Sequence, residues 1–277
     1  MNPIDSSEVP VARPDAALLD RVAARLRQLF VGTARAYILQ QPDGSYRTVR
    51  RRLTTNVVKH MLLTGGSVGA YQVSNGRVPW ICFDFDVTKS AQQAAGNAGW
   101  ASIIDDRLLP LVDQLIAHLR SLAIPHLVEF SGNRGVHIWV IFDRPVPRAT
   151  AYRVLSALLD GATLSHDLGD IQIDRFPADE ESVSRYGKAV KLPLARHRKS
   201  QRFAYLMAVS ESAKLDTPKL YSSLTEALLL SQAAILDQHR PISAAALLAK
   251  LNLPIEPPGP AEAPVAQFLR CQVICDR

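Results

Sequence analysis

The stretch Trp80-Ile-Cys-Phe-Asp-Phe-Asp86 is an apolar segment that ends in two acids one residue apart. Side chains alternate across a β-strand, so Asp84 and Asp86 would project from one face while Phe83 and Phe85 pack on the other. Carboxylates held this close repel each other unless a cation lies between them, and their oxygens suit Mg²⁺ or Mn²⁺. An Asp-x-Asp strand alone is more often a polar sheet face, so the two-metal site it predicts needs further partners along the chain.

The composition indicates a globular protein with an excess of positive charge. Of the 277 residues 47% are hydrophobic, and 32 Lys and Arg against 26 Asp and Glu give a net charge of +6. This composition excludes disorder as the main state. Much of the excess charge lies in two runs without acids, at 47–59 and 185–202. Either run indicates a nucleic-acid contact or an ordinary solvated face.

Cysteine usage and hydropathy indicate the compartment. Cys82, Cys271 and Cys275 are too few for a disulfide framework. Cys271 and Cys275 are spaced like half of a metal site, although ordinary helix residues one turn apart share that spacing. The N-terminus lacks the basic start and apolar core of a signal peptide, and no segment is long and apolar enough to span a bilayer. We expect a soluble cytoplasmic protein without a membrane partner.

The chain is expected to divide into four parts. These are a flexible lead-in at 1–14, a catalytic domain at 15–210, a helical segment at 211–253, and a proline-rich linker at 254–277 that opens a possible further domain. Within the catalytic domain, residues 15–75 form an α/β unit and residues 76–210 the acid-bearing sheet.

Two turn signals predict two hairpins. Pro42-Asp-Gly-Ser45 would join strands at 36–40 and 46–49, and Ser74-Asn-Gly-Arg77 would join strands at 68–73 and 78–87. From residue 78 onward the order strand-helix-strand-strand-helix-strand predicts a split βαβ sheet, on which acids of neighbouring strands converge.

Three features would meet on the open face of that sheet. Asp174, at the end of a later strand, would join Asp84 and Asp86 around two ions. The turn at 131–135 offers backbone N–H groups and the Arg134 guanidinium to a phosphate, although alone it is an ordinary hairpin turn. His137 would donate to the same phosphate, unless it is a half-buried histidine without a role. The other side of a triphosphate would be closed by Lys191, Arg196, His197 and Lys199.

Four segments together resemble the successive motifs of the archaeo-eukaryotic primase superfamily. They are Phe83-Asp-Phe-Asp86, Ser131-Gly-x-x-Gly-x-His137-x-Trp139, Ile173-Asp-x-Phe-Pro177, and Lys191-Leu-Pro-Leu-Ala-x-His197. The chain is most similar to the primase-polymerases of CRISPR-associated and TOTE conflict systems, over about 68–206. One departure is that the third motif usually reads Glu with Phe-Pro-Lys, whereas Asp174 and Phe176-Pro-Ala178 stand here, so a lysine role cannot be carried over.

The resemblance implies an α+β primase core with an RRM-like sheet, an N-terminal α/β unit and C-terminal helices. It implies template-directed nucleotidyl transfer from NTPs or dNTPs to a primer or an initiating nucleotide, on a single-stranded DNA template. Asp84, Asp86 and Asp174 would hold two Mg²⁺ or Mn²⁺ ions. The nucleotide would contact Ser131, Gly132, Arg134, His137, Lys191, Arg196, His197 and Tyr71. DNA would lie on Arg50, Arg51, Arg52, Lys59, Arg198 and Lys199. CRISPR, helicase or reverse-transcriptase components are the expected fused or associated partners.

Other classes use similar parts. A metal-dependent nuclease or rolling-circle nickase would need a nucleophilic tyrosine near paired histidines, and the chain contains no His-x-His pair. A non-catalytic RRM-like module would carry aromatics rather than acids on its central strands. Among polymerases, a ligase-associated repair polymerase is the nearest competitor.

Overall fold

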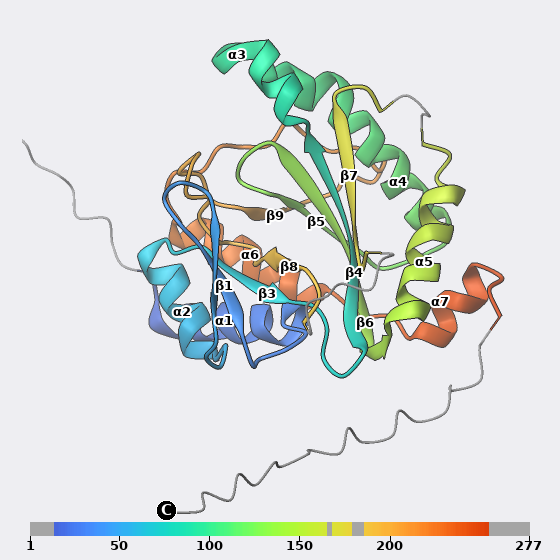
Figure 1. Ribbon diagram of the computed structural model, residues 1–277, viewed down its shortest axis with the longest axis horizontal. Coiled ribbons are helices and arrows are strands. Elements are labelled where there is room, and N and C mark those ends of the chain that lie inside the picture. Colours follow the sequence, from blue (N-terminus) through green and yellow to red (C-terminus); the bar gives the residue numbers. More distant parts are fainter. Residues whose placement is uncertain (1–13, 165–167, 179–185, 255–277) are drawn as a thin grey trace, which may run out of the picture.

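The computed structural model describes residues 14–164, 168–178 and 186–254, and its framework is two antiparallel sheets (Figure 1). The four-stranded sheet has the order β2-β1-β3-β8 and the five-stranded sheet the order β7-β4-β6-β5-β9. The strands are β1 (Tyr37–Gln40), β2 (Tyr46–Val49), β3 (Val68–Tyr71), β4 (Arg77–Val87), β5 (Leu127–Phe130), β6 (Gly135–Pro147), β7 (Ile171–Phe176), β8 (Ala189–Lys191) and β9 (Tyr205–Met207). The helices are α1 (Ala16–Phe30), α2 (Thr55–Thr64), α3 (Lys89–Ile103), the π-helix η1 (Ile104–Leu108), α4 (Leu109–Ser121), α5 (Arg148–Gly161), α6 (Glu226–Gln238) and α7 (Ala244–Lys250). The predicted α+β class is confirmed.

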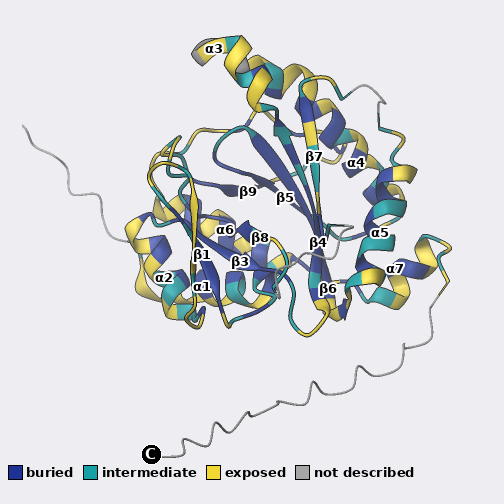
Figure 2. Cartoon of the chain, in the orientation of Figure 1, coloured by how far each residue is buried: buried dark blue, intermediate teal, exposed yellow. Residues whose placement is uncertain are grey.

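The five-stranded sheet has the predicted split βαβ order. The acid-bearing strand β4 lies between β6 and β7, and β5 joins the far side of β6. Phe83 and Phe85 are fully buried, and α5 packs against this strand from one side. Figure 2 shows β3 and β5 and most of β4 and β6 as buried, whereas the outer strands β2 and β7 carry exposed and intermediate residues. Alternation along β4 thus directs phenylalanines into the core and aspartates to the opposite face.

That opposite face is divided in two. Toward the start of β4, Trp80 packs edge-on against Trp139 at 4.8 Å between ring centroids, and Trp139 packs against Phe30 of α1 at 5.0 Å. The indole nitrogen of Trp80 also donates to the Phe30 carbonyl at 3.0 Å. Helix α1 therefore covers the aromatic half of this face, and the acids lie beyond the covered half.

The four-stranded sheet confirms one hairpin prediction and corrects the other. Strands β1 and β2 pair as expected. Strand β3, however, pairs with β1 and β8 rather than with β4, so the predicted 68–73/78–87 hairpin is wrong. The turn reverses the chain through a bridge between Ser74 and Arg77, and Gln72 then donates its side-chain amide to the Trp80 carbonyl at 2.7 Å. A turn signal fixes only the reversal, because nonlocal packing decides which strands pair.

Local signals set several helix ends. Asp15 and Thr54 accept hydrogen bonds from the backbone at the starts of α1 and α2, and Gly65 ends α2 in the left-handed conformation at φ 62°. Helix α3 runs directly into the π-helix η1, and the chain then continues as α4. No helix among the described residues is both long and apolar enough to cross a membrane. The lead-in at 1–13, the linker from 255 onward, and Cys271 and Cys275 lie outside the described residues.

Candidate active site

Four ionisable side chains form a row across the five-stranded sheet. Asp174 of β7 is directly opposite Asp84 of β4, Asp84 is opposite His137 of β6, and His137 is opposite Glu129 of β5. Directly opposed residues project from the same face of a sheet. Asp86, two residues along β4, shares that face, so the register alone brings the three aspartates together, with Glu129 at the far end of the row.

Asp84, Asp86, His137 and Asp174 line a cavity of about 900 Å³ between the two sheets, and the fully buried Glu129 lies behind His137. Ten residues predicted from the sequence line it: Tyr71, Asp84, Asp86, Ser131, Arg134, His137, Asp174, Lys191, His197 and Lys199. The opposite wall comes from β1, β2, β3 and β8. The structure therefore brings the predicted acids and most of the predicted phosphate contacts together, and their roles remain predictions.

Asp86 is held in an unfavourable electrostatic position. Burial and the neighbouring charge of Asp84 raise the pKa of Asp86 to about 6, although Arg134 opposes the shift. Arg134 Nη2 lies 2.9 Å from Asp86 Oδ2, and the guanidinium also donates to the Val87 carbonyl. The residue opposite Asp86 is Gly135, where an added Cβ would lie 2.1 Å from Asp86 Oδ1. Glycine is required here because the carboxylate occupies the space of a side chain.

His137 is a buried cation between two acids. Its Nδ1 lies 2.9 Å from Glu129 Oε2, and its Nε2 lies 3.3 Å from Asp84 Oδ1. Burial alone would lower the pKa of His137, but the charges of Asp84 and Glu129 outweigh it and raise the pKa to about 10. The imidazole is therefore protonated at neutral pH and presents a positive charge beside Asp84.

Lys191 supplies a second buried cation from the other sheet. Its Nζ donates to the Ser131 carbonyl at 2.6 Å, which ties β8 to the turn at 131–135. Burial lowers the pKa of Lys191 to about 8, against the opposing charges of Glu129, Asp84 and Asp86. The lysine thus carries its charge at neutral pH and loses it under mildly alkaline conditions.

The basic segment that follows Lys191 contributes less charge than expected. Burial and the charges of Lys191 and Lys199 lower the pKa of His197 to about 3, so its imidazole is neutral. Arg196 is not among the cavity residues, because its guanidinium lies over the Phe203 ring at 5.8 Å and donates to the Gln201 carbonyl. The expected ring of cations around a triphosphate is therefore reduced to Arg134, His137, Lys191 and Lys199.

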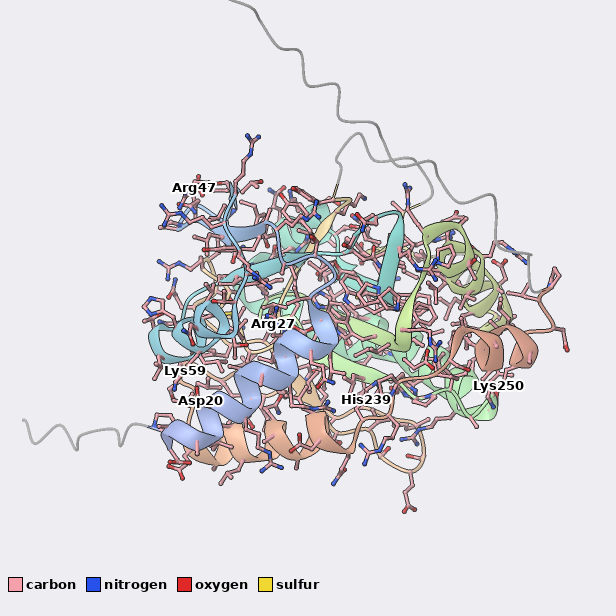
Figure 3. All side chains as sticks on the ribbon, turned by 90° about the horizontal axis from the view of Figure 1, so that it is seen from below. Asp20, Arg27, Arg47, Lys59, His239 and Lys250 are labelled. Atoms are coloured by element: carbon pink, nitrogen blue, oxygen red, sulfur yellow. The ribbon has the colours of Figure 1, made fainter. Side chains whose placement is uncertain are left out.

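Other predicted contacts also differ in placement. Tyr71 does not lie on a strand paired with β4, yet it lines the cavity from β3, with its hydroxyl 2.7 Å from Thr48 Oγ1. Lys59 is ion-paired with Asp20 at 2.6 Å, whereas Arg50, Arg51 and Arg52 are exposed. Figure 3 shows the nearby Arg47 extending away from the body of the protein. Gly132 and Arg198 adjoin the cavity without lining it.

Glu129 and Tyr46 are among the residues of the site that were missed from the sequence. Glu129 is fully buried and accepts hydrogen bonds from His137 Nδ1 and, at 2.8 Å, from Trp139 Nε1. An acid inside the apolar stretch Leu127–Phe130 was the available signal, since buried acids are rare unless paired. Tyr46 lines the cavity mouth from β2 with 52% of its surface exposed. No sequence signal distinguished it from an ordinary strand tyrosine.

The acids suit divalent cations in their chemistry. Asp84 Oδ1 is buried and makes no hydrogen bond of good geometry to any described residue, although His137 Nε2 lies 3.3 Å away, so this carboxylate oxygen at the centre of the row is incompletely satisfied. Among the described residues no three His, Cys, Asp or Glu side chains already form a compact ligand cluster. Three carboxylates with one incompletely satisfied oxygen are a donor set for Mg²⁺ or Mn²⁺. Asp84, Asp86 and Asp174 are the residues that would hold them.

The match to a family model shows the class of protein, the nucleotidyltransferases built on the archaeo-eukaryotic primase core. The family described as "TOTE conflict system, Archaeo-Eukaryotic Primase domain" matches residues 38–225, and the chain belongs to this family. No curated protein matches the sequence.

Several solved structures are similar to the chain, and they include the following two. One is the AEP domain of the primase-polymerase of cyanophage S-2L, with 13% identity and a TM-score of 0.33 over 80% of this chain and 100% of that chain. The other is the polymerase domain of Mycobacterium tuberculosis Ligase D in complex with DNA, with 12% identity and a TM-score of 0.42 over 85% of this chain and 86% of that chain.

Proposed function

We propose that this protein is a metal-dependent primase-polymerase: on a single-stranded DNA template, a hydroxyl of the primer or initiating nucleotide attacks the α-phosphate of an NTP or dNTP, and pyrophosphate leaves. The observation that carries this proposal is the register of β4 with its neighbours. It gathers Asp84, Asp86 and Asp174 on one wall of a cavity whose other walls carry Lys191 and His197.

The acids and cations divide the work of the reaction between them. Two Mg²⁺ or Mn²⁺ ions, when bound by the three aspartates, lower the pKa of an attacking hydroxyl and neutralise leaving phosphates. The protonated His137 and the charged Lys191 provide fixed positive charge for the triphosphate, and the backbone of the turn at 131–135 provides N–H donors. These groups are buried, so their electrostatic effect is screened less than it would be in water.

Template and primer are proposed to lie on the exposed arginines at 50–52 and on Arg198 and Lys199. Phosphate contacts of this kind carry affinity without sequence information. The proposed setting is a CRISPR-associated or mobile-element system in which helicase or reverse-transcriptase components act with this chain. Family membership in a conflict-system group favours such a setting over ligase-associated repair.

The decisive experiment is primer extension and de novo synthesis by the full chain, with Mn²⁺ and a single-stranded template. Synthesis that Asp84→Asn and Asp174→Asn abolish supports the proposal. A folded chain that binds DNA but incorporates no nucleotide would instead support the non-catalytic binding module, although acids rather than aromatics on β4 argue against that reading.

A further inference from the structure

The short hairpin at 196–203 carries His197 and lies directly against the turn at 131–135. Arg196 and Phe203 form a bridge, and His197 N donates to the Arg202 carbonyl at 2.8 Å. Gly132 in the turn has a φ of +79°, and a Cβ there would lie 2.9 Å from Ala204 N. The two segments therefore touch backbone to backbone, and Ser200 lies at the bend of the hairpin.

The hydroxyl of Ser200 connects the two segments. Its Oγ lies 2.5 Å from the Gly132 carbonyl oxygen, which accepts and cannot donate. The single hydroxyl proton is therefore used in this bond. The hairpin and the turn are held together by a hydrogen bond from one serine side chain.

The backbone of Ser200 contacts the imidazole of His197. Ser200 N lies 3.2 Å from His197 Nδ1 and donates to it. A backbone N–H only donates, so Nδ1 must offer a lone pair, and in the neutral ring the proton then resides on Nε2. The hydrogen bonds that described residues make to this ring all reach Nδ1, and the ring lines the cavity. The Nε2–H group is thus available as a neutral donor.

The surroundings of the ring favour the neutral form. Lys191, Lys199 and Arg134 are the charged groups that act on it, and all three are cationic. Protonating Nδ1 would also make its N–H point at the backbone N–H of Ser200, and the two donors would repel each other. A neutral donor among three cations binds an anion without adding to their mutual repulsion.

We propose that Ser200 is a positioning residue for the triphosphate site. Its N–H fixes His197 as the Nε2–H tautomer, and its Oγ holds the turn at 131–135 against the hairpin so that both face one ligand. The assignment of that ligand as a triphosphate rests on the proposed function. The tautomer of His197 and the hydrogen bond from Ser200 Oγ to the Gly132 carbonyl do not depend on it.

The tautomer is tested by nitrogen-15 NMR of the full chain with labelled histidine, using His197→Gln to assign the signal. We expect an unprotonated Nδ1 and a protonated Nε2 from pH 6 to 8, in wild type and in Ser200→Ala, since alanine keeps the N–H. An Nδ1–H tautomer or an imidazolium at pH 7 would overturn the inference.

The hydrogen bond from Ser200 Oγ to the Gly132 carbonyl is tested by calorimetric titration with dGTP and Ca²⁺, and by KM and kcat in primer extension. Ser200→Ala should weaken dGTP binding and raise KM by roughly three- to tenfold with little change in kcat, the size of one hydrogen bond. Ser200→Thr should restore both. Ser121→Ala removes a similar bond to the His118 carbonyl at the end of α4 and should change neither.

The outcomes separate the inference from the proposed function. Unchanged dGTP affinity in Ser200→Ala, or equal loss in Ser121→Ala, would overturn the positioning role. If wild type binds no dGTP, the triphosphate assignment fails together with the proposed function, while the NMR measurement still decides the tautomer. A stronger loss with His197→Asn than with His197→Gln would support the Nε2 donor, because only glutamine can place an N–H near that position.

Discussion

Asp86 of β4 and Arg134 of the turn at 131–135 form an ion pair, with Arg134 Nη2 2.9 Å from Asp86 Oδ2. The sequence predicts different partners for them, a metal ion for the aspartate and a triphosphate for the arginine. Each residue must therefore leave the other to take up its predicted ligand. Binding of a cation at Asp86 would free Arg134, so cation and nucleotide binding are expected to reinforce each other.

Asp86→Asn should stabilise the metal-free protein while abolishing synthesis. The pKa of this carboxyl is raised from 3.8 to about 6, so its ionised form is less favourable in the folded state than in the unfolded state. The resulting loss of folding stability is complete above about pH 6 and disappears as the pH falls toward 4. We expect a gain on the order of 1–3 kcal/mol at pH 7.5 in EDTA. Urea unfolding across pH measures it. Asp106→Asn, at an exposed site, is the control, and a less stable Asp86→Asn would refute the argument.

Glu129→Gln should lower the pKa of His137 from about 10 while keeping the shape of the site. The amide oxygen of glutamine can accept the same two hydrogen bonds, from His137 and Trp139, so the variant removes the charge and places the amide NH2 where the unpartnered Oε1 lies. NMR titration of His137 reports the pKa, and dGTP affinity should fall with it because less positive charge faces the triphosphate. Glu211→Gln, on the surface, should leave both unchanged. A His137 that titrates as in wild type would show that Glu129 has no electrostatic role.

Nucleotide affinity should fall as the pH rises through about 8. Lys191 loses its proton there because burial lowers its pKa, and the triphosphate then meets a neutral amine. Lys191→Gln should bind dGTP more weakly at pH 7 and show no further loss up to pH 9. Lys250→Gln, at the end of α7, serves as the matched control for charge. If dGTP affinity still falls between pH 7 and 9 in Lys191→Gln, the titrating group is not Lys191.

Tyr71→Ala should reduce discrimination between ribo- and deoxynucleotides. Tyr71 is buried, with 9% of its surface exposed, and its hydroxyl is hydrogen-bonded to Thr48. The side chain therefore forms a fixed wall of the cavity. If that wall lies under the sugar, removing it should change the incorporation ratio by about tenfold, as filling or emptying a small pocket does. Tyr71→Phe keeps the ring and should behave like wild type. Identical ratios in all three proteins would make Tyr71 a packing residue only.

DNA binding should weaken steeply with salt. Replacing Arg50, Arg51 and Arg52 together by alanine should lower the slope of log affinity against log salt by about two for single-stranded DNA. Lys59→Ala should have little effect, because Lys59 is already paired with Asp20. Fluorescence anisotropy at several salt concentrations gives both slopes. A flat salt response in wild type would contradict the proposed DNA path.

Sequence periodicity was sufficient for the elements of the catalytic sheet. Alternation in Trp80–Asp86 placed both acids on one face, and the order of strands and helices gave the split βαβ arrangement, because these features depend on neighbours along the chain. The same local reasoning misassigned β3, whose turn resembled a hairpin. Its actual partners, β1 and β8, come from segments far apart in sequence.

The sequence by itself predicted which residues would carry the chemistry: the three aspartates, the turn at 131–135 and His137. Only the tertiary structure decided their charge states and pairings. Asp174 lies opposite Asp84, and His137 is hydrogen-bonded to Glu129. Arg134 forms an ion pair with Asp86, and His197 is neutral because burial and nearby cations lower its pKa. The physical reason is that a side chain's intrinsic chemistry is fixed by its type, whereas its pKa and hydrogen bonds depend on burial and on charges from distant segments, which only folding brings within reach.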